Sequence, residues 1–169
     1  MTVADKIDHI INIEFKNKIA LPSTYENPIN KAILAVLKNE KADLPCTINV
    51  LITGDEEIRE FNRDYRNINK ATDVLSFPMQ NFSGFGWEQM VSPEPDLETN
   101  YIPLGDIVVS METVIRQAAE YKNSPEYELI YLIIHSTLHL LGYDHDSEEN
   151  EKIMHDKNKT IAEKLNKGT

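Results

Sequence analysis

Three of the chain's five histidines stand close together toward the C-terminal end, as His135, His139 and His145. Residues four apart on a helix are separated by one turn plus about 40° and a rise of about 6 Å, so the first two imidazoles share a face and can reach one ion. Gly142 can adopt the left-handed conformation that ends a helix, which lets His145 turn back toward the pair. Three neutral imidazoles leave a fourth tetrahedral position for water, as in catalytic zinc sites. The spacing predicts one divalent ion, with Zn²⁺ as the first candidate, bound by His135, His139 and His145.

The alternative interpretation of these histidines is structural. A histidine on an apolar helix is more often a hydrogen-bonded core residue than a metal ligand. Here the helical pair, the helix-ending glycine and the third histidine coincide, and leaving two unpaired imidazoles in a core would cost stability. The coincidence favours the metal site.

The same spacing matches the metzincin protease pattern H-E-x-x-H-x-x-G-x-x-H. In those proteases the residue after the first histidine is a glutamate base, but this chain has Ser136, which cannot take a proton from water at neutral pH. A peptidase would need a base from elsewhere. Asp106 and Asp146 are the carboxylates that we would test as base or as partners of the ligands.

The helix that must carry the histidine pair is marked at both ends. Residues 125–141 are preceded by Ser124 as N-cap, begin with Pro125 and are followed by Gly142. Apolar residues lie all round this helix, which is typical of a central, buried element.

The rest of the chain alternates between strand-like and helix-like patterns. Asp55 is a plausible N-cap for one helix, and Ser110 could cap another. The patterns predict about four strands packed with helices: strands over 9–15, 46–53, 72–77 and 104–110, and helices over 25–40, 56–66, 111–122, 125–141 and 147–165.

The chain's 169 residues fit one domain, over 1–169. The segment 78–103 has no period, and a connection of this length tends to be a functional or mobile loop. We expect a long flexible loop beside the active site, with a plain surface insertion as the alternative.

The composition excludes several classes of protein. The net charge of -11 argues against a non-specific nucleic-acid coat, although a local cationic slot or recruitment by a partner stays compatible with it. No apolar run reaches the roughly 20 residues of a membrane span, and we expect neither a membrane anchor nor a signal peptide. Cys46 is the single cysteine, which excludes an internal disulfide and fits a cytoplasmic location.

Three blocks of sequence together resemble the YbeY family of endoribonucleases, also described as rRNA maturation factors. The blocks are HSTLHLLGYDH at 135–145, TDVLSFP at 72–78 preceded by Asn62, Tyr65 and Arg66, and LGDI at 104–107. The combination is more specific than the histidine spacing alone.

The resemblance implies an α+β fold with a four-stranded mixed sheet, a zinc-class ion on His135, His139 and His145, and cleavage of single-stranded RNA. It also implies a role in ribosome quality control and in processing the 3′ end of small-subunit ribosomal RNA, with the ribosome or ribosomal proteins as partners and no role for DNA. Arg66 matches an arginine implicated in activity, and its chemistry suits a phosphate. The alternative role for Arg66 is a surface ion pair with Asp64 or Asp73.

Two other functions remain open from the sequence. One is a metal-dependent hydrolase acting on another ester or on an amide, as an esterase or a peptidase does. The other is a non-catalytic, ribosome-associated factor whose zinc is structural, and an ion fully coordinated by protein would favour it.

Overall fold

The computed structural model describes residues 7–16 and 23–167. Over these residues the predicted helices and strands are present, with bounds that differ from the expectation by a few residues at most. The strands are β1 (Ile10–Phe15), β2 (Cys46–Thr53), β3 (Val74–Pro78), β4 (Asn81–Phe82), β5 (Met90–Val91) and β6 (Ile102–Ser110). The α-helices are α1 (Glu26–Asn39), α2 (Asp55–Arg66), α3 (Met111–Glu120), α4 (Pro125–Leu140) and α5 (Glu148–Lys167), with short 3₁₀ turns at η2 (Ser23–Tyr25) and η3 (Trp87–Gln89).

The main sheet has four strands in the order β1-β2-β6-β3. β1, β2 and β6 run parallel, and β3 pairs with β6 in the antiparallel sense. β6 is almost entirely apolar and mostly buried along its length, as expected of a central strand covered on both faces. The predicted α+β fold with a four-stranded mixed sheet is confirmed.

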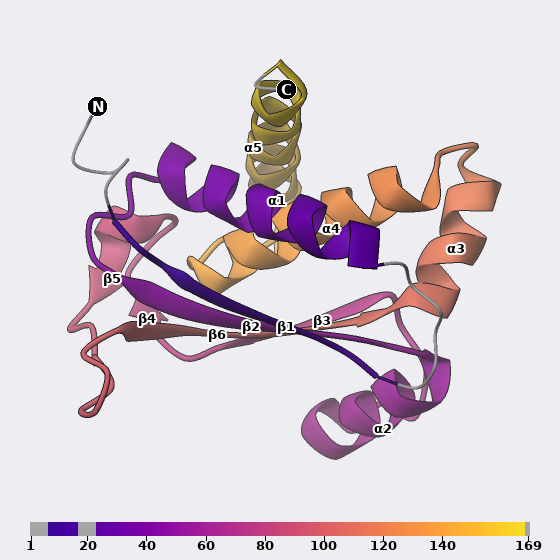
Figure 1. Cartoon of the computed structure of the whole chain (residues 1–169), viewed down its shortest axis with the longest axis horizontal. Helices are drawn as coiled ribbons and strands as arrows, with labels where there is room; N and C mark the ends of the chain where they lie inside the picture. Colours follow the sequence, from indigo (N-terminus) through magenta and orange to yellow (C-terminus); the bar gives the residue numbers. More distant parts are fainter. Residues whose placement is uncertain (1–6, 17–22, 168–169) are drawn as a thin grey trace.

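Helix α4 lies at the centre of the helical layer. It packs against α1, α3 and α5 and against strands β3 and β6. Figure 1 shows α1 and α4 over one face of the sheet and α2 below the other. Ile133, Ile134 and Leu138 on α4 are fully buried in the main apolar core, so the prediction of a central, buried helix is confirmed.

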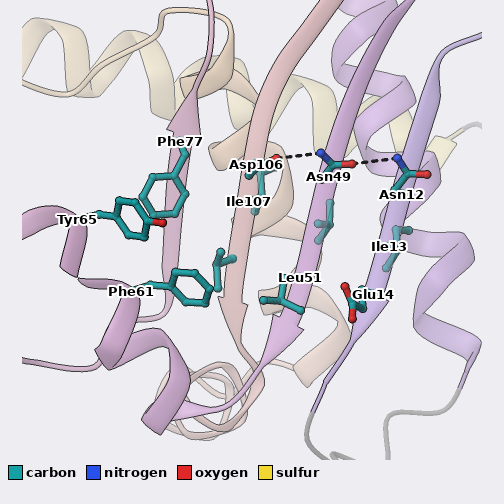
Figure 2. A pocket seen from close by; sticks show the side chains of 12 residues that line it. Asn12, Ile13, Glu14, Asn49, Leu51, Phe61, Tyr65, Phe77, Asp106 and Ile107 are labelled. Carbon is teal, nitrogen blue, oxygen red and sulfur yellow. Dashed lines mark hydrogen bonds between the residues drawn. The ribbon is translucent and has the colours of Figure 1, made fainter. Parts of the chain in front are cut away.

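The opposite face of the sheet carries a row of polar side chains. The Nδ2 of Asn12 donates to Asn49 at 2.9 Å, and the Nδ2 of Asn49 donates to Asp106 at 3.0 Å (Figure 2). α2 covers one end of this face, where the ring of Tyr65 meets Phe77 edge-on at 5.3 Å. The row and these aromatic rings line a hollow of about 490 Å³, which α4 does not reach.

The segment 78–103 differs from the loop without secondary structure that its sequence predicted. Strand β4 pairs with β5, and η3 lies between them. Trp87 is only 7% exposed and donates its Nε1 hydrogen to Asp43 at 2.7 Å, which anchors the segment to the body of the molecule. Strands of two residues are too short to show a period, so the pattern could not reveal them. The mobility of the segment stays a prediction.

The start of α2 also differs in detail from the expectation. Gly54 is the N-cap and Asp55 is the first helical residue. The Asp55 carboxylate accepts hydrogen bonds from Ser110, Thr113 and Arg116, so it joins α2 to α3 instead of capping its own helix. Within the described ranges, no helix combines the length and apolar character needed to cross a membrane.

Candidate metal centre

The ends of α4 are fixed by the residues that the sequence marked. At the N-terminus, the hydroxyl of Ser124 accepts from the backbone N–H of Tyr127 at 3.1 Å. At the C-terminus, Gly142 has a φ of +91°. A Cβ at Gly142 would lie 2.7 Å from Phe82 and 2.8 Å from the carbonyl oxygen of Gly84, so only glycine fits there without a shift. The chain therefore turns sharply beside the last turn of α4.

This turn brings the three predicted histidines together. One candidate ligand atom from each of His135, His139 and His145 lies within 4.8 Å of the others. The Nε2 atoms of His135 and His139 are 3.2 Å apart. Two nitrogens on a tetrahedral zinc ion, each bonded at about 2.0–2.1 Å, lie about 3.3 Å apart. The donor set and its spacing therefore fit a divalent ion, and the geometric part of the prediction is confirmed.

One hydrogen bond sets the orientation of His139. Its Nδ1 lies 2.8 Å from the carbonyl oxygen of Tyr143. Because a carbonyl can only accept, Nδ1 must carry the hydrogen, which leaves the lone pair on Nε2 facing His135. Such a partner on the far side of the ring is typical of metal-binding histidines.

Burial keeps the two helical histidines neutral. Burial, followed by the neighbouring His139 and His145, lowers the pKa of His135 to about 4. Burial also lowers the pKa of His139, against the raising effect of the Tyr143 carbonyl, and the positive charge of Arg66 contributes in the same direction as burial. Both rings are therefore uncharged at neutral pH, the form that binds a metal.

A cleft of about 610 Å³ lies beside the three histidines. It is bounded by α4, by strand β3, by the start of the 78–103 segment and by the turn after α4. Its lining includes Arg66, Thr72, Asp73, Ser76, Gln80, Asn81, Phe82, Tyr143 and Asp144. Thr72, Asp73 and Ser76, which belong to the 72–78 block, thus form part of the cleft wall.

Arg66 lies at the end of α2 and reaches this cleft. It is exposed, and one guanidinium nitrogen donates to the carbonyl oxygen of Ser76 at 3.2 Å. The ion pair with Asp64 is made by Arg63 instead, at 3.0 Å, and Asp73 accepts from the backbone N–H of Val74. Within residues 7–16 and 23–167, no ion pair joins Arg66 to either aspartate.

The two predicted carboxylates do not reach the histidines. A Cβ at Gly105 would meet Leu140 of α4, so the next residue, Asp106, points to the other face of the sheet, where Figure 2 shows it bonded to Asn49. Asp146 is exposed and accepts from Asn150 at 2.6 Å, outside the cleft lining. Ser136 is fully buried, which removes it from the cleft as well.

Asp144, in the turn after α4, lies at the site but was not one of the two predicted carboxylates. It accepts from the backbone N–H of His145 at 2.8 Å, as expected of a turn-stabilising aspartate. It also lines the cleft together with Arg66. Its position between Tyr143 and His145 was the available signal, because both neighbours take part in the site.

A mixed sheet with a buried helix that presents neutral imidazoles to an open cleft is an arrangement that hydrolases with a metal site use. Comparisons with known proteins specify the class further. A family model described as "Endoribonuclease YbeY" matches residues 10–166. The chain is 42% identical to an endoribonuclease YbeY of Acetivibrio thermocellus over 151 residues, which is 89% of this chain and 93% of that protein. It is 43% identical to one of a Thermoanaerobacter species over 143 residues, which is 85% of this chain and 89% of that protein.

The chain belongs to the YbeY family of endoribonucleases. A solution structure of a Thermotoga maritima protein has the same fold, with a TM-score of 0.60 and 30% identity over 92% of this chain and 89% of the other. The resemblance found in the sequence blocks is therefore confirmed.

Proposed function

We propose that this protein is a metal-dependent endoribonuclease that cleaves single-stranded RNA during maturation and quality control of ribosomal RNA. The observation that carries the proposal is the convergence of His135, His139 and His145 beside a cleft that also holds Arg66. Membership of the YbeY endoribonuclease family supports RNA as the substrate. We infer that residues 1–169 act as one endoribonuclease domain.

His135, His139 and His145 would hold the ion, with Zn²⁺ as the first candidate. When bound, such an ion lowers the pKa of water to about 7 and polarises a phosphoryl oxygen. The Tyr143 carbonyl keeps the Nε2 lone pair of His139 directed at the ion position.

Arg66 and Asp144 supply the other chemistry of the cleft. Arg66 offers a planar guanidinium to the phosphate from the end of α2. Asp73 and Asp144 are the carboxylates that line the cleft, in place of the predicted Asp106 and Asp146, and Asp144 is the one next to His145 in the chain. We would therefore test Asp144 first as the proton acceptor.

The deciding experiment measures metal content and RNA cleavage on the same preparations. Protein purified without an affinity tag should contain about one divalent ion per chain. The variant His139→Ala should lose most of that ion and its cleavage of single-stranded RNA, whereas His155→Gln on α5 should keep the ion. Full metal retention in all three single alanine variants of His135, His139 and His145 would refute the site.

The other functions predict different results. A peptidase would show chelator-sensitive hydrolysis of unfolded protein that disappears in His135→Ala, but the burial of Ser136 leaves the cleft without the metzincin base. A structural zinc would show no exchangeable water at the ion and no metal-dependent RNA cleavage. We propose that ribosomal proteins deliver the enzyme to ribosomal RNA in the cytoplasm. The net charge of -11 supports delivery by a partner, because the free chain has few cations that could bind RNA.

A further inference from the structure

A second hollow shares His135 and His145 with the cleft but has different walls otherwise. Like the cleft, it has a volume of about 610 Å³, and both are lined by His135 and His145. Its other walls come from Tyr131 of α4 and from the first half of α5, with Glu148, Glu151, Lys152, Met154 and His155. Two hollows with different outer walls therefore adjoin the candidate ligands.

Two tyrosines continue from this hollow along α4. Tyr127, Tyr131 and His135 follow one another at intervals of four residues, about 6 Å per step along one side of the helix. The ring of Tyr131 lies 6.4 Å from that of His135 and is nearly parallel to it, at 15°. Tyr127 is 52% exposed and shares with Tyr131 a third hollow of about 380 Å³. We call Tyr127 and Tyr131 the tyrosine track.

The walls of the track are held by contacts between helices. The Nδ2 of Asn158 on α5 donates to the carbonyl oxygen of Tyr131 at 3.3 Å. Lys157 on α5 forms an ion pair with Glu40 after α1, at 3.3 Å. α5 is therefore fixed against α4 and α1, and the rings of the track stand on a rigid support.

An endonuclease cuts within a strand, so nucleotides must continue on both sides of the phosphate at the reacting centre. Resting on the proposed function, we propose that the tyrosine track binds the bases on one side of the scissile phosphate by stacking, while the Arg66 cleft holds the other side. Aromatic stacking is the sequence-tolerant way in which proteins bind single-stranded RNA.

The charges along the track favour stacking over phosphate binding. Its hollows contain Lys31 and Lys152, but also Glu126, Glu148 and Glu151. Carboxylates outnumber cations there, so binding an RNA phosphate in these hollows is electrostatically unfavourable. The aromatic rings must therefore supply the affinity for RNA. The track therefore contributes to substrate binding and acts as a positioning surface, not as part of the chemical step.

The test uses a single-stranded RNA with one mapped cleavage position. Tyr131→Leu keeps a large apolar side chain but removes the aromatic face, and it should raise KM about 5- to 100-fold with little change in kcat. Tyr131→Phe and Tyr131→Trp should cleave like the wild type. Binding of the same RNA to chelated protein, followed by fluorescence anisotropy, should weaken by a similar factor in Tyr131→Leu.

RNAs with two abasic nucleotides on one side of the cleavage position locate the contact. Removing bases on the track side should weaken RNA binding by the wild type to the level of Tyr131→Leu, so that the two proteins no longer differ in affinity. Removing bases on the other side should leave that difference intact.

The matched control is Tyr121→Leu, because Tyr121 is 61% exposed at the end of α3, outside the linings of the cleft and of the track's hollows. The proposal would be refuted if Tyr121→Leu weakened RNA binding and raised KM as much as Tyr131→Leu does. It would also be refuted if a folded Tyr131→Leu had the KM and RNA affinity of the wild type. If Tyr131→Leu fails to fold, the exposed Tyr127→Leu takes its place with the same expectations. RNA binding that depends on Tyr131 without metal-dependent cleavage would refute the proposed function and leave the track standing.

Discussion

At the scale of single residues, the site depends on which atom of each side chain is free to act. The carbonyl of Tyr143 fixes the hydrogen of His139 on Nδ1, and burial keeps His135 uncharged. Both effects present nitrogen lone pairs before any ion arrives. The ligands are therefore ordered during folding, so metal binding does not have to supply the free energy of ordering them.

Arg66 can be separated from the metal ligands by a conservative change. Arg66→Lys keeps the positive charge but removes the planar fork that holds a phosphate oxygen pair. We expect the variant to retain metal and fold, and to lose about 10- to 1000-fold in RNA cleavage, the effect of removing a transition-state donor worth about 1.5 to 4 kcal/mol. Steady-state kinetics together with metal analysis would measure this.

Arg63→Lys is the matched control, because Arg63 is on the same helix and pairs with Asp64. It should cleave at the wild-type rate. If Arg66→Lys behaved in the same way, Arg66 would be a surface residue without a role in catalysis, and loss of metal or stability would make it structural.

The histidines were predictable from the sequence because helical periodicity fixes which side chains share a face. The position of Asp106 was not predictable. Strand β6 has apolar residues on both faces, so its sequence does not indicate which face of the sheet Asp106 occupies. The role of Asp144 depends on the path of the turn after Gly142, and spacing alone does not define that path.

At the scale of elements, the turn at Gly142 connects α4 to the third ligand. Gly142→Ala places a Cβ against Phe82 and forces a positive φ on a residue that resists it. We expect a loss of about 1 to 3 kcal/mol in the free energy of unfolding. Metal affinity should fall as well, because His145 follows the turn.

Denaturant unfolding and a metal titration would measure the two effects. Gly84→Ala is the control, since its Cβ would meet only the flexible side chain of Gln89, at 3.3 Å. A Gly142→Ala protein with wild-type stability and metal affinity would show that the turn tolerates other conformations.

Asp55 joins α2 to α3, and its contribution should depend on pH. Partial burial raises the pKa of Asp55, but hydrogen bonds from Ser110, Thr113 and Arg116 more than offset this, so the pKa lies below the usual 3.8. Asp55→Asn replaces one acceptor oxygen with a donor. We expect it to cost about 1 to 2 kcal/mol of stability at pH 7.

The sign of the pH effect follows from the direction of the shift. A carboxylate with a lowered folded-state pKa stabilises the protein fully above its unfolded-state pKa, and this contribution is lost as pH falls through the folded-state pKa. The stability difference between wild type and Asp55→Asn should therefore shrink below about pH 3.8. Urea unfolding at several pH values would measure it, and a constant difference would contradict the assignment.

The sequence predicted the elements of the main sheet well, because their strands and helices are long enough to show a period. It missed β4 and β5, which are too short to show a period, and the hydrogen bond from Trp87 to Asp43, which joins residues 44 positions apart. It also placed Asp55 as a cap, because the partners on α3 that redirect its carboxylate are distant in the chain.

At the scale of the whole molecule, the net charge of -11 limits how RNA can be bound. Arg66 and Lys152 are the cations lining the two hollows beside the histidines. Two neutralised phosphates correspond to a slope of about -1.4 in a plot of log affinity against log salt for single strands. We expect a slope between about -1 and -2 for the free protein, and weak binding to arbitrary RNA at physiological salt.

Anisotropy titrations across a range of salt concentrations would measure the slope. Arg66→Gln should make it shallower by about 0.7. A much steeper slope, or tight binding to arbitrary RNA without ribosomal components, would show a cationic surface that these hollows do not contain.

The order of the strands has a consequence for synthesis of the chain. β2 lies next to β6 in the sheet, so it lacks this partner until β6 has been synthesised. The face that the two strands form is covered only when α4 is complete. At about 5 to 20 residues per second, the stretch from Cys46 to Leu140 takes about 5 to 20 s to be made. During that time the nascent chain exposes an apolar strand with no partner on one side. A chain arrested before α4 should therefore be insoluble or remain bound to a chaperone, because the helix that covers the apolar face has not yet been made.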